Sequence, residues 1–196
     1  MSEFRERLAA AKAGDEAAFV QLFRGVQPTL LRYLTTLGGS LAEDAAAETW
    51  VSVLRGLPKF AGDEAGWRAW VFTIGHARLR DAQRRAIRDP TPVDAAARLE
   101  DRADPEDVPA RVEELMSTEA ALALVARLPR TEAAVVLLRH VAGFDVPTTA
   151  RVLGKKDGTV RVAAHRGLAR LADMLEQDPK PDVTGSESRT VTEMTW

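Results

Sequence analysis

Residues 145–171 read DVPTTARVLGKKDGTVRVAAHRGLARL, and this stretch decides the fold. Ala150 offers the small side chain that is needed where two helices cross. Gly154, four residues later, can adopt the positive φ of a tight turn, and Val160, six residues further on, can lock a second helix onto the first. Pro147 lies where the first turn of a helix tolerates a missing N–H. The spacing predicts a helix-turn-helix.

The helix after this turn has two faces. Helical spacing predicts a buried stripe of Val160, Ala164, Leu168 and Leu171. The other face would enter the major groove of duplex DNA, and its residues are Lys155, Lys156, Thr159, Arg161, Val162, His165 and Arg166. Arg161 is the best candidate for a base edge, because a bidentate arginine–guanine pair gives about 1–3 kcal/mol of discrimination. Lys155, Lys156 and Arg166 suit phosphates, which position a protein without specifying sequence. The alternative is a surface helix with ordinary solvated cations.

Helical periodicity runs through the rest of the chain, and no alternating strand pattern is bounded by hairpin turns. We expect an all-α fold. Helix starts are predicted at Asp15, at a capping box from Ser40 to Glu43, at Thr131 and at Asp145. Breaks are predicted at 25–28 and at Gly38-Gly39. Two helices carry clear inner faces, one with Trp50, Val53, Leu54 and Leu57, and one over about 64–85 with Trp67, Trp70, Val71 and Ile74.

Charge divides the 196 residues, although the net charge is only −2. Residues 1–85 and 115–175 are apolar-rich and mildly basic. Between them, 86–114 holds 4 basic against 9 acidic residues together with several prolines, and 176–196 is a polar, acidic tail. This pattern predicts two small helical domains, a flexible acidic linker and a C-terminal tail.

Several classes of protein are excluded or disfavoured by composition. The chain has no cysteine, so disulfides and thiolate metal sites are excluded, and its three histidines form no metal-binding cluster in the sequence. No apolar run is long enough to span a bilayer, so we expect a cytoplasmic protein. An enzyme using His76 or His140 as a base is a weak alternative, because no catalytic constellation or phosphate-binding glycine loop is visible. We therefore expect no catalytic residues, metal or cofactor.

These residues resemble region four of the extracytoplasmic-function (ECF) sigma factors, the smallest members of the sigma-70 family. The resemblance is carried by Leu128-Pro129, Glu132, Leu137-Leu138-Arg139, Gly143, Ala150, Leu153-Gly154, Gly158-Thr159-Val160 and His165-Arg166. The N-terminal block independently resembles region two of the same family. Its carriers are Gly14-Asp15, Ala18-Phe19, Leu31-Arg32-Tyr33, Asp44, Glu48-Thr49, Arg68-Ala69-Trp70, Ile74, Asp81 and Arg84-Arg85. Together the matches cover about 10–85 and 118–172, in the family's order.

The resemblance implies a sigma factor that directs the RNA polymerase core to promoters and has no enzymatic activity of its own. Region two is implied to bind the β′ clamp helices through the helix that carries Asp44 and Glu48. Its residues from about 60 to 85 are implied to recognise and open the minus-ten element. Region four is implied to read the minus-thirty-five element and to meet the β flap. The acidic linker is expected to follow the RNA exit path, and an anti-sigma factor is a further implied partner.

Contacts with the opened strand are expected on the helix over about 64–85. His76, Arg80 and Arg84 are spaced to form a cationic stripe opposite Trp70 and Ile74, suited to the phosphate backbone. Trp67, nearer the preceding loop, is a candidate for stacking on a base, with a place in the core as its alternative.

The chain departs from the family pattern at several positions. Ala47 stands where the family usually has glutamine in the core-binding helix, and Ala77 replaces an asparagine near the minus-ten base. Val162 and Ala163 stand where serine and arginine are usual, and Thr149 replaces an aliphatic packing residue. The promoter sequence therefore does not follow from the resemblance. A helix-turn-helix regulator that binds operators without polymerase is the competing hypothesis, but it leaves the region-two match unexplained.

Overall fold

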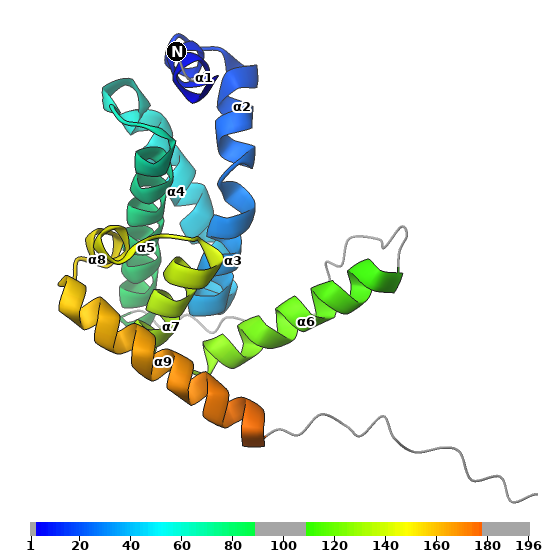
Figure 1. Cartoon of the computed structure of the whole chain (residues 1–196). Coiled ribbons are helices and arrows are strands. Elements are labelled where there is room, and N and C mark those ends of the chain that lie inside the picture. Colours follow the sequence, from blue (N-terminus) through cyan, green and yellow to red (C-terminus); the bar gives the residue numbers. More distant parts are fainter. Residues whose placement is uncertain (1–2, 89–108, 178–196) are drawn as a thin grey trace, which may run out of the picture.

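A computed structural model describes the backbone of residues 3–88 and 109–177, and the side chains of 3–88 and 118–177. The described residues are helical and contain no strand, which confirms the all-α prediction. The first group of helices is α1 (Glu3–Lys12), α2 (Glu16–Arg24), α3 (Gln27–Gly38), α4 (Ala42–Gly56) and α5 (Glu64–Arg88). Short 3-10 turns, η1 (Gly39–Leu41) and η2 (Leu57–Lys59), lie on either side of α4. Figure 1 shows α5 running between α4 and the C-terminal helices.

The helix boundaries of this first group follow local chemistry. Asp15 caps α2 as predicted, because its carboxylate accepts a hydrogen bond from the N–H of Ala18 at 3.0 Å. The predicted breaks separate α2 from α3 and end α3 at Gly38. The prediction that a capping box from Ser40 to Glu43 starts α4 is wrong. Gly39 adopts φ +55° and opens a 3-10 turn, so α4 begins only at Ala42 and has no side-chain cap.

The inner face of α4 is also smaller than predicted. Trp50, Val53 and Leu57 are buried, with Phe19 and Phe23 packed against the indole of Trp50. Leu54, predicted to face inward, is instead 50% exposed. A 3.6-residue period places Leu54 about 100° from Val53, beyond the edge of the stripe that α3 and α5 cover.

The second group of helices is α6 (Pro109–Ala126), α7 (Arg130–Val136) with a π-helical continuation η3 (Leu137–Val141), α8 (Val146–Leu153) and α9 (Asp157–Gln177). The helical boundaries differ from the predicted linker at 86–114, since α5 continues to Arg88 and α6 begins at Pro109. Thr131 is not a cap. Pro129 takes that position, because its extended ψ of 136° lets its carbonyl accept the N–H of Ala133 at 3.0 Å.

The two groups pack against each other and share one continuous apolar core. The rings of Phe72 on α5 and Phe144, in the loop before α8, meet edge to face with centroids 5.1 Å apart. Arg68 donates from Nη2 to the carbonyl oxygen of Ala142 at 2.8 Å, and its guanidinium lies 5.6 Å from the centre of the Phe144 ring. In Figure 1, α8 accordingly lies across α5, with α7 beside α3. The charge pattern that predicted two separate domains did not indicate that the two helical groups pack against each other.

Two predictions lie outside the described residues. The acidic linker is described only at its edges, so 89–108 carries no structural account. The same holds for 178–196 of the C-terminal tail.

Candidate nucleic-acid interface

The helix-turn-helix forms as its sequence predicts. The carboxylate of Asp145 accepts a hydrogen bond from the N–H of Thr148 at 2.8 Å, which caps α8. Hydrogen bonding by the side chain of Thr148, and after it by its backbone, lowers the pKa of that carboxyl. Pro147 lies in the first turn of α8. Gly154 ends the helix in the left-handed region, with φ +61° and ψ 39°, and its N–H reaches back to the last turn. Ala150 is buried at the crossing with α9.

The buried face of α9 is rotated from the predicted one. Val160 is fully buried, but Leu168 is 45% exposed. In its place Ala163 and Gly167 are buried against α7. A Cβ on Gly167 would lie 2.9 Å from Cγ2 of Val136, so this glycine permits the close approach of the two helices. Ala163 therefore packs inside the motif and is not available to DNA.

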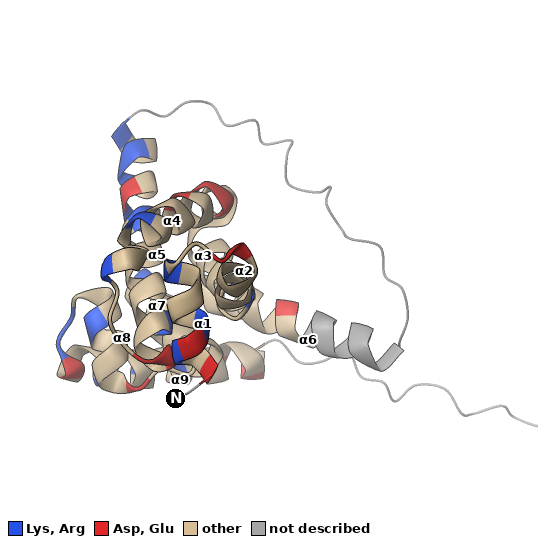
Figure 2. Cartoon of the chain, turned by 90° about the horizontal axis from the view of Figure 1, so that it is seen from above, with Lys and Arg blue, Asp and Glu red and all other residues tan. Residues whose placement is uncertain are grey.

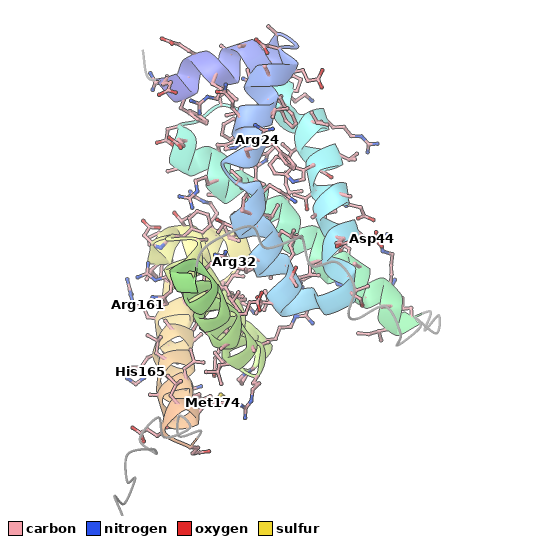
Figure 3. The ribbon with its side chains drawn as sticks, turned by 90° about the vertical axis from the view of Figure 1, so that its right-hand side faces the viewer. Arg24, Arg32, Asp44, Arg161, His165 and Met174 are labelled. Carbon is pink, nitrogen blue, oxygen red and sulfur yellow. The ribbon has the colours of Figure 1, made fainter. Side chains whose placement is uncertain are left out.

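All seven predicted DNA-contacting residues of this motif lie on one exposed surface of the turn and α9. They are Lys155, Lys156, Thr159, Arg161, Val162, His165 and Arg166. Figure 3 labels Arg161 and His165, whose side chains project from α9 away from the rest of the molecule. Val162 is 50% exposed, an apolar side chain among cations that can meet a thymine methyl group. An exposed helix face of this kind can enter the major groove of duplex DNA. The contacts of these residues with bases stay a prediction.

Thr149 on α8, the departure from the family's aliphatic residue, is fully buried. Its hydroxyl has no hydrogen-bond partner among the described residues. A buried polar group without a partner costs free energy, so this position weakens α8 packing slightly.

The predicted strand-binding stripe on α5 is only partly available. Arg80 and Arg84 are exposed, and Figure 2 shows basic residues gathered toward the C-terminal end of α5. His76 is half-buried, and its Nδ1 lies 2.8 Å from the hydroxyl of Tyr33. Burial, and after it the charges of Arg80, Arg130 and Lys155, lower the pKa of His76 to about 4. The ring is therefore neutral near pH 7, and the prediction that His76 supplies a positive charge is wrong.

Trp67 belongs to the core. It is only 1% exposed and packs on Phe60 and Trp70 with ring centroids 5.5 and 5.6 Å away, so the prediction that it stacks on a base is wrong for this arrangement. Trp70 is half-buried and stacks on Phe60 with an interplanar angle of 25°. Because α5 begins at Glu64, Trp67 lies in its first turn, where the rings of Phe60 and Trp70 pack against it.

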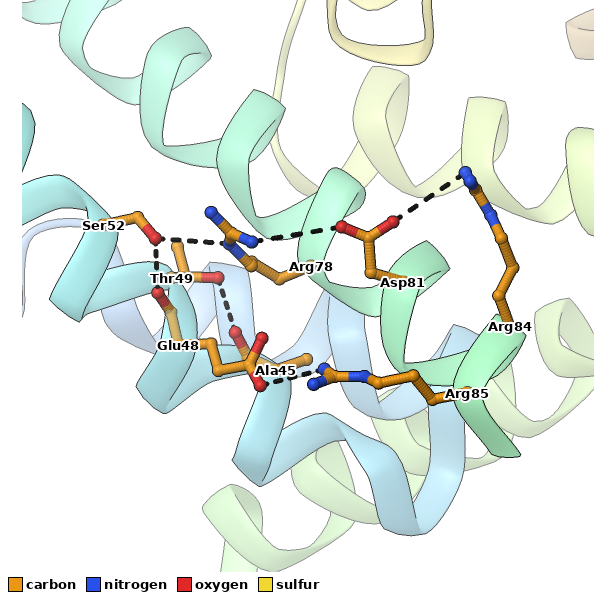
Figure 4. A network of polar contacts seen from close by, with 8 residues as sticks. All are labelled: Ala45, Glu48, Thr49, Ser52, Arg78, Asp81, Arg84 and Arg85. Atoms are coloured by element: carbon orange, nitrogen blue, oxygen red, sulfur yellow. Dashed lines mark hydrogen bonds and ion pairs between the residues drawn. The ribbon is translucent and has the colours of Figure 1, made fainter. Parts of the chain in front are cut away.

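The outward face of α4 carries both acidic and apolar side chains. Asp44 is exposed, and Glu48 forms an ion pair of 2.9 Å with Arg85 of α5. Figure 4 shows this pair beside a second link, from Nε of Arg78 to Oγ of Ser52 at 3.2 Å. Sequence reasoning missed two exposed apolar residues on the same face, Val51 (47%) and Leu54 (50%). Their spacing from Asp44 and Glu48 at helical intervals was a signal that the chain offered.

Comparison with known proteins assigns both groups of helices. Residues 22–88 match the family description "Sigma-70 region 2", and residues 118–171 match "Sigma-70, region 4". The chain is 36% identical over 176 residues to the ECF RNA polymerase sigma factor ShbA of Streptomyces griseus, covering 85% of this chain and 92% of that protein. It belongs to the ECF branch of the sigma-70 family. This sigma factor is thus a promoter-specificity subunit that serves RNA polymerase in transcription initiation.

Other relatives agree. The sigma factor is 37% identical over 173 residues to SigM of Mycobacterium tuberculosis, covering 87% of this chain and 83% of that one. Among solved structures it resembles CnrH, in complex with the cytosolic domain of CnrY, at 25% identity with a TM-score of 0.61, covering 89% of this chain and 98% of that chain. It shares the fold of RpoE from Bartonella quintana, in complex with the anti-sigma factor NepR, at 20% identity and TM-score 0.63, covering 82% and 98%.

Two further observations concern this sigma factor as a whole. In the part of the chain that the structure describes, no helix is long and apolar enough to cross a membrane. Within the same residues, no group of three or more histidine and acidic side chains is placed to hold a metal ion.

Proposed function

We propose that this sigma factor divides its work between three surfaces. The outward face of α4 docks on the β′ clamp helices, Arg80 and Arg84 on α5 hold the opened minus-ten strand, and the exposed face of α9 reads the minus-thirty-five element. The β flap is the expected contact of the second helical group. The observation that carries the proposal is that every predicted contact residue of the turn and α9 is exposed. The helix-turn-helix that presents them has its expected cap at Asp145 and its turn at Gly154.

The positions of the α4 and α9 surfaces allow core polymerase and duplex DNA to be contacted at the same time. In Figure 3, Asp44 on α4 and Arg161 on α9 lie on opposite sides of the molecule. Polymerase on one side would therefore leave the reading face of α9 open to duplex DNA. The exposed apolar pair of Val51 and Leu54 adds area that desolvates on docking, which acidic residues alone would not supply.

The packed arrangement of the two helical groups differs from the one needed on a promoter. Two elements about 25 base pairs apart are separated by ~85 Å at 3.4 Å per pair. A compact chain of this size has a radius of gyration of only about 16 Å. The two groups must therefore separate when both elements are bound, and we propose that polymerase binding drives this separation.

We further propose that the protein acts without enzymatic chemistry of its own and works in the cytoplasm, where polymerase and chromosome lie. The solved relatives bound to a partner's cytosolic domain or to an anti-sigma factor support an anti-sigma factor as a regulator of this chain as well.

Co-purification with core polymerase tests the α4 surface. Val51→Glu combined with Leu54→Glu should lower recovery with core at least tenfold, because two charges would be buried against the clamp. Asp44→Arg combined with Glu48→Arg should also lower recovery at least tenfold, because positive charges would replace the negative charges that α4 presents to the clamp helices. Ala9→Glu, at an exposed residue of α1 with no assigned contact, is the control and should leave recovery unchanged. Full recovery of both double variants would place the core interface elsewhere.

A further inference from the structure

A cavity of about 500 Å³ lies where the two helical groups meet. Residues of both groups line it, and four of them are cationic. Arg80 and Arg84 come from α5, Arg130 begins α7, and Lys155 follows the turn after α8. The volume lies within the range of small-molecule sites.

These cations have little internal neutralisation. Of these four cations, only Arg84 has a carboxylate of a described residue within 4 Å, that of Asp81 at 3.9 Å. The charges also converge, since Arg80, Arg130 and Lys155 all act on the ring of His76 at the cavity wall. The ring itself is neutral and does not add to the repulsion. Like charges from the two groups thus face one another across the interface, and this opposes the packed arrangement.

The remaining wall combines the polar side chains of Gln83 and Thr131 with an apolar part. Leu37, Leu79 and Leu153 line the interior, and Ile87 lies at the same cavity with 81% of its surface exposed. Such a wall can receive a flat heterocycle, while the four cations suit several phosphate oxygens in a row. A nucleoside with a chain of phosphates has both parts.

We propose that this cavity binds a nucleoside di- or triphosphate, or a longer nucleoside polyphosphate, and that the bound anion holds the two helical groups together. The phosphates neutralise the facing cations of α5 and α7, and the base lies against Ile87 and the leucines. Because Arg80 and Arg84 are also the candidate strand-binding residues, the ligand and the opened promoter strand compete for them. This inference concerns the packed arrangement and does not depend on the assigned contacts with polymerase.

Calorimetric titration of the full chain, without polymerase or DNA, tests the site. The probes are ATP, GTP and inorganic tripolyphosphate, at low salt because phosphate contacts are screened. We expect both nucleotides to bind with one site per chain. Arg130→Ala should weaken all three probes about tenfold or more, since it removes a charge-assisted contact. Arg130 is exposed and has no assigned role in DNA or core binding.

Two further variants separate the ligand's parts. Arg127→Ala, an exposed charge change that does not line the cavity, is the matched control and should leave affinities within about twofold. Ile87→Ser should weaken the nucleotides but not tripolyphosphate. Absence of binding up to about 1 mM, or equal losses in Arg127→Ala and Arg130→Ala, would overturn the site. Binding of tripolyphosphate alone would overturn its nucleoside selectivity.

X-ray scattering measures the second half of the proposal. Phe144→Ala removes the ring contact with Phe72 between the two groups and should enlarge the particle. GTP should reduce the radius of gyration of this variant, and the double variant with Arg130→Ala should not respond at the same concentration. A bound nucleotide that leaves the particle size unchanged, or enlarges it, would overturn the claim that the anion holds the two groups together.

Discussion

Helices α9 and α5 are both expected to contact promoter DNA, but they differ in how much of the expected surface is exposed. The predicted contact residues of α9 are all exposed, whereas α5 packs against α8 along part of its length. On α9 the buried edge is Val160 with two small residues, Ala163 and Gly167, and the small residues let the helix sit close to α7. On α5 the aromatic residues Trp67 and Phe72 are themselves core.

The different exposure of α9 and α5 fits their different expected ligands, duplex DNA for α9 and an opened strand for α5. A surface that reads duplex DNA is complete within one helix-turn-helix, so it can be ready before polymerase arrives. A surface that holds single-stranded DNA is needed only after melting, which costs about 1.4 kcal/mol per base step. On the proposed assignment, packing of the second helical group on α5 covers part of the strand-binding surface, and separation of the two groups would uncover it.

Phe144→Ala should have the largest effect on this comparison. The change removes the ring pair with Phe72 and the contact with Arg68, at a cost of about 3–4 kcal/mol. We expect the two groups to separate, seen as a larger radius of gyration in solution scattering. Phe60→Ala, which removes an aromatic contact within the first group only, should destabilise without enlarging the particle. An unchanged radius in Phe144→Ala would show that other contacts hold the groups together.

Arg161→Ala tests α9 without disturbing the packing. Loss of a base contact should cost about 1–3 kcal/mol and relax preference at one upstream base pair, as measured by binding to a panel of promoter variants. Arg166→Ala is the comparison, since loss of a phosphate contact should weaken all sequences equally and lower the salt slope by about 1. Unchanged preference in Arg161→Ala would contradict its reading role.

His76 makes the α5 side of the interface sensitive to pH. Its folded pKa of about 4 lies below its usual 6.5, so the unfolded chain binds a proton first as the pH falls. Stability is therefore complete above about pH 6.5 and decreases toward pH 4, by roughly 1–2 kcal/mol after allowance for its partial exposure. Denaturant unfolding of His76→Gln should show a flatter pH profile than wild type. His140→Gln, at an exposed histidine, should keep the wild-type slope.

Thr149→Val should have the smallest effect and the opposite sign. Replacing a fully buried hydroxyl, which finds no hydrogen-bond partner in the part of the chain that the structure describes, by a methyl group of the same shape should stabilise the chain by about 1 kcal/mol. Thr148→Val is the control, because Thr148 is half-buried and its hydroxyl accepts a hydrogen bond from Arg151. A rise in melting temperature in the control but not in Thr149→Val would refute the assignment.

The sequence predicted the turn at Gly154, the caps at Asp15 and Asp145, and the exposed cations of α9, because each depends on residues a few positions apart. It failed at Ser40, where a positive φ at Gly39 inserted a 3-10 turn. It also failed at Leu168 and Leu54, where periodicity gives the direction of a side chain but not the width of the face that a neighbour covers.

Local chemistry alone thus determined the helices, their main boundaries, the helix-turn-helix and the resemblance to two sigma-factor regions. The tertiary structure decided that Trp67 is core, that His76 is neutral, and that four cations from α5, α7 and the turn after α8 line one cavity. Burial and the electric field at a side chain depend on which helices pack together. Phe72 and Phe144 are far apart in the sequence, so no short sequence pattern predicts that their rings meet.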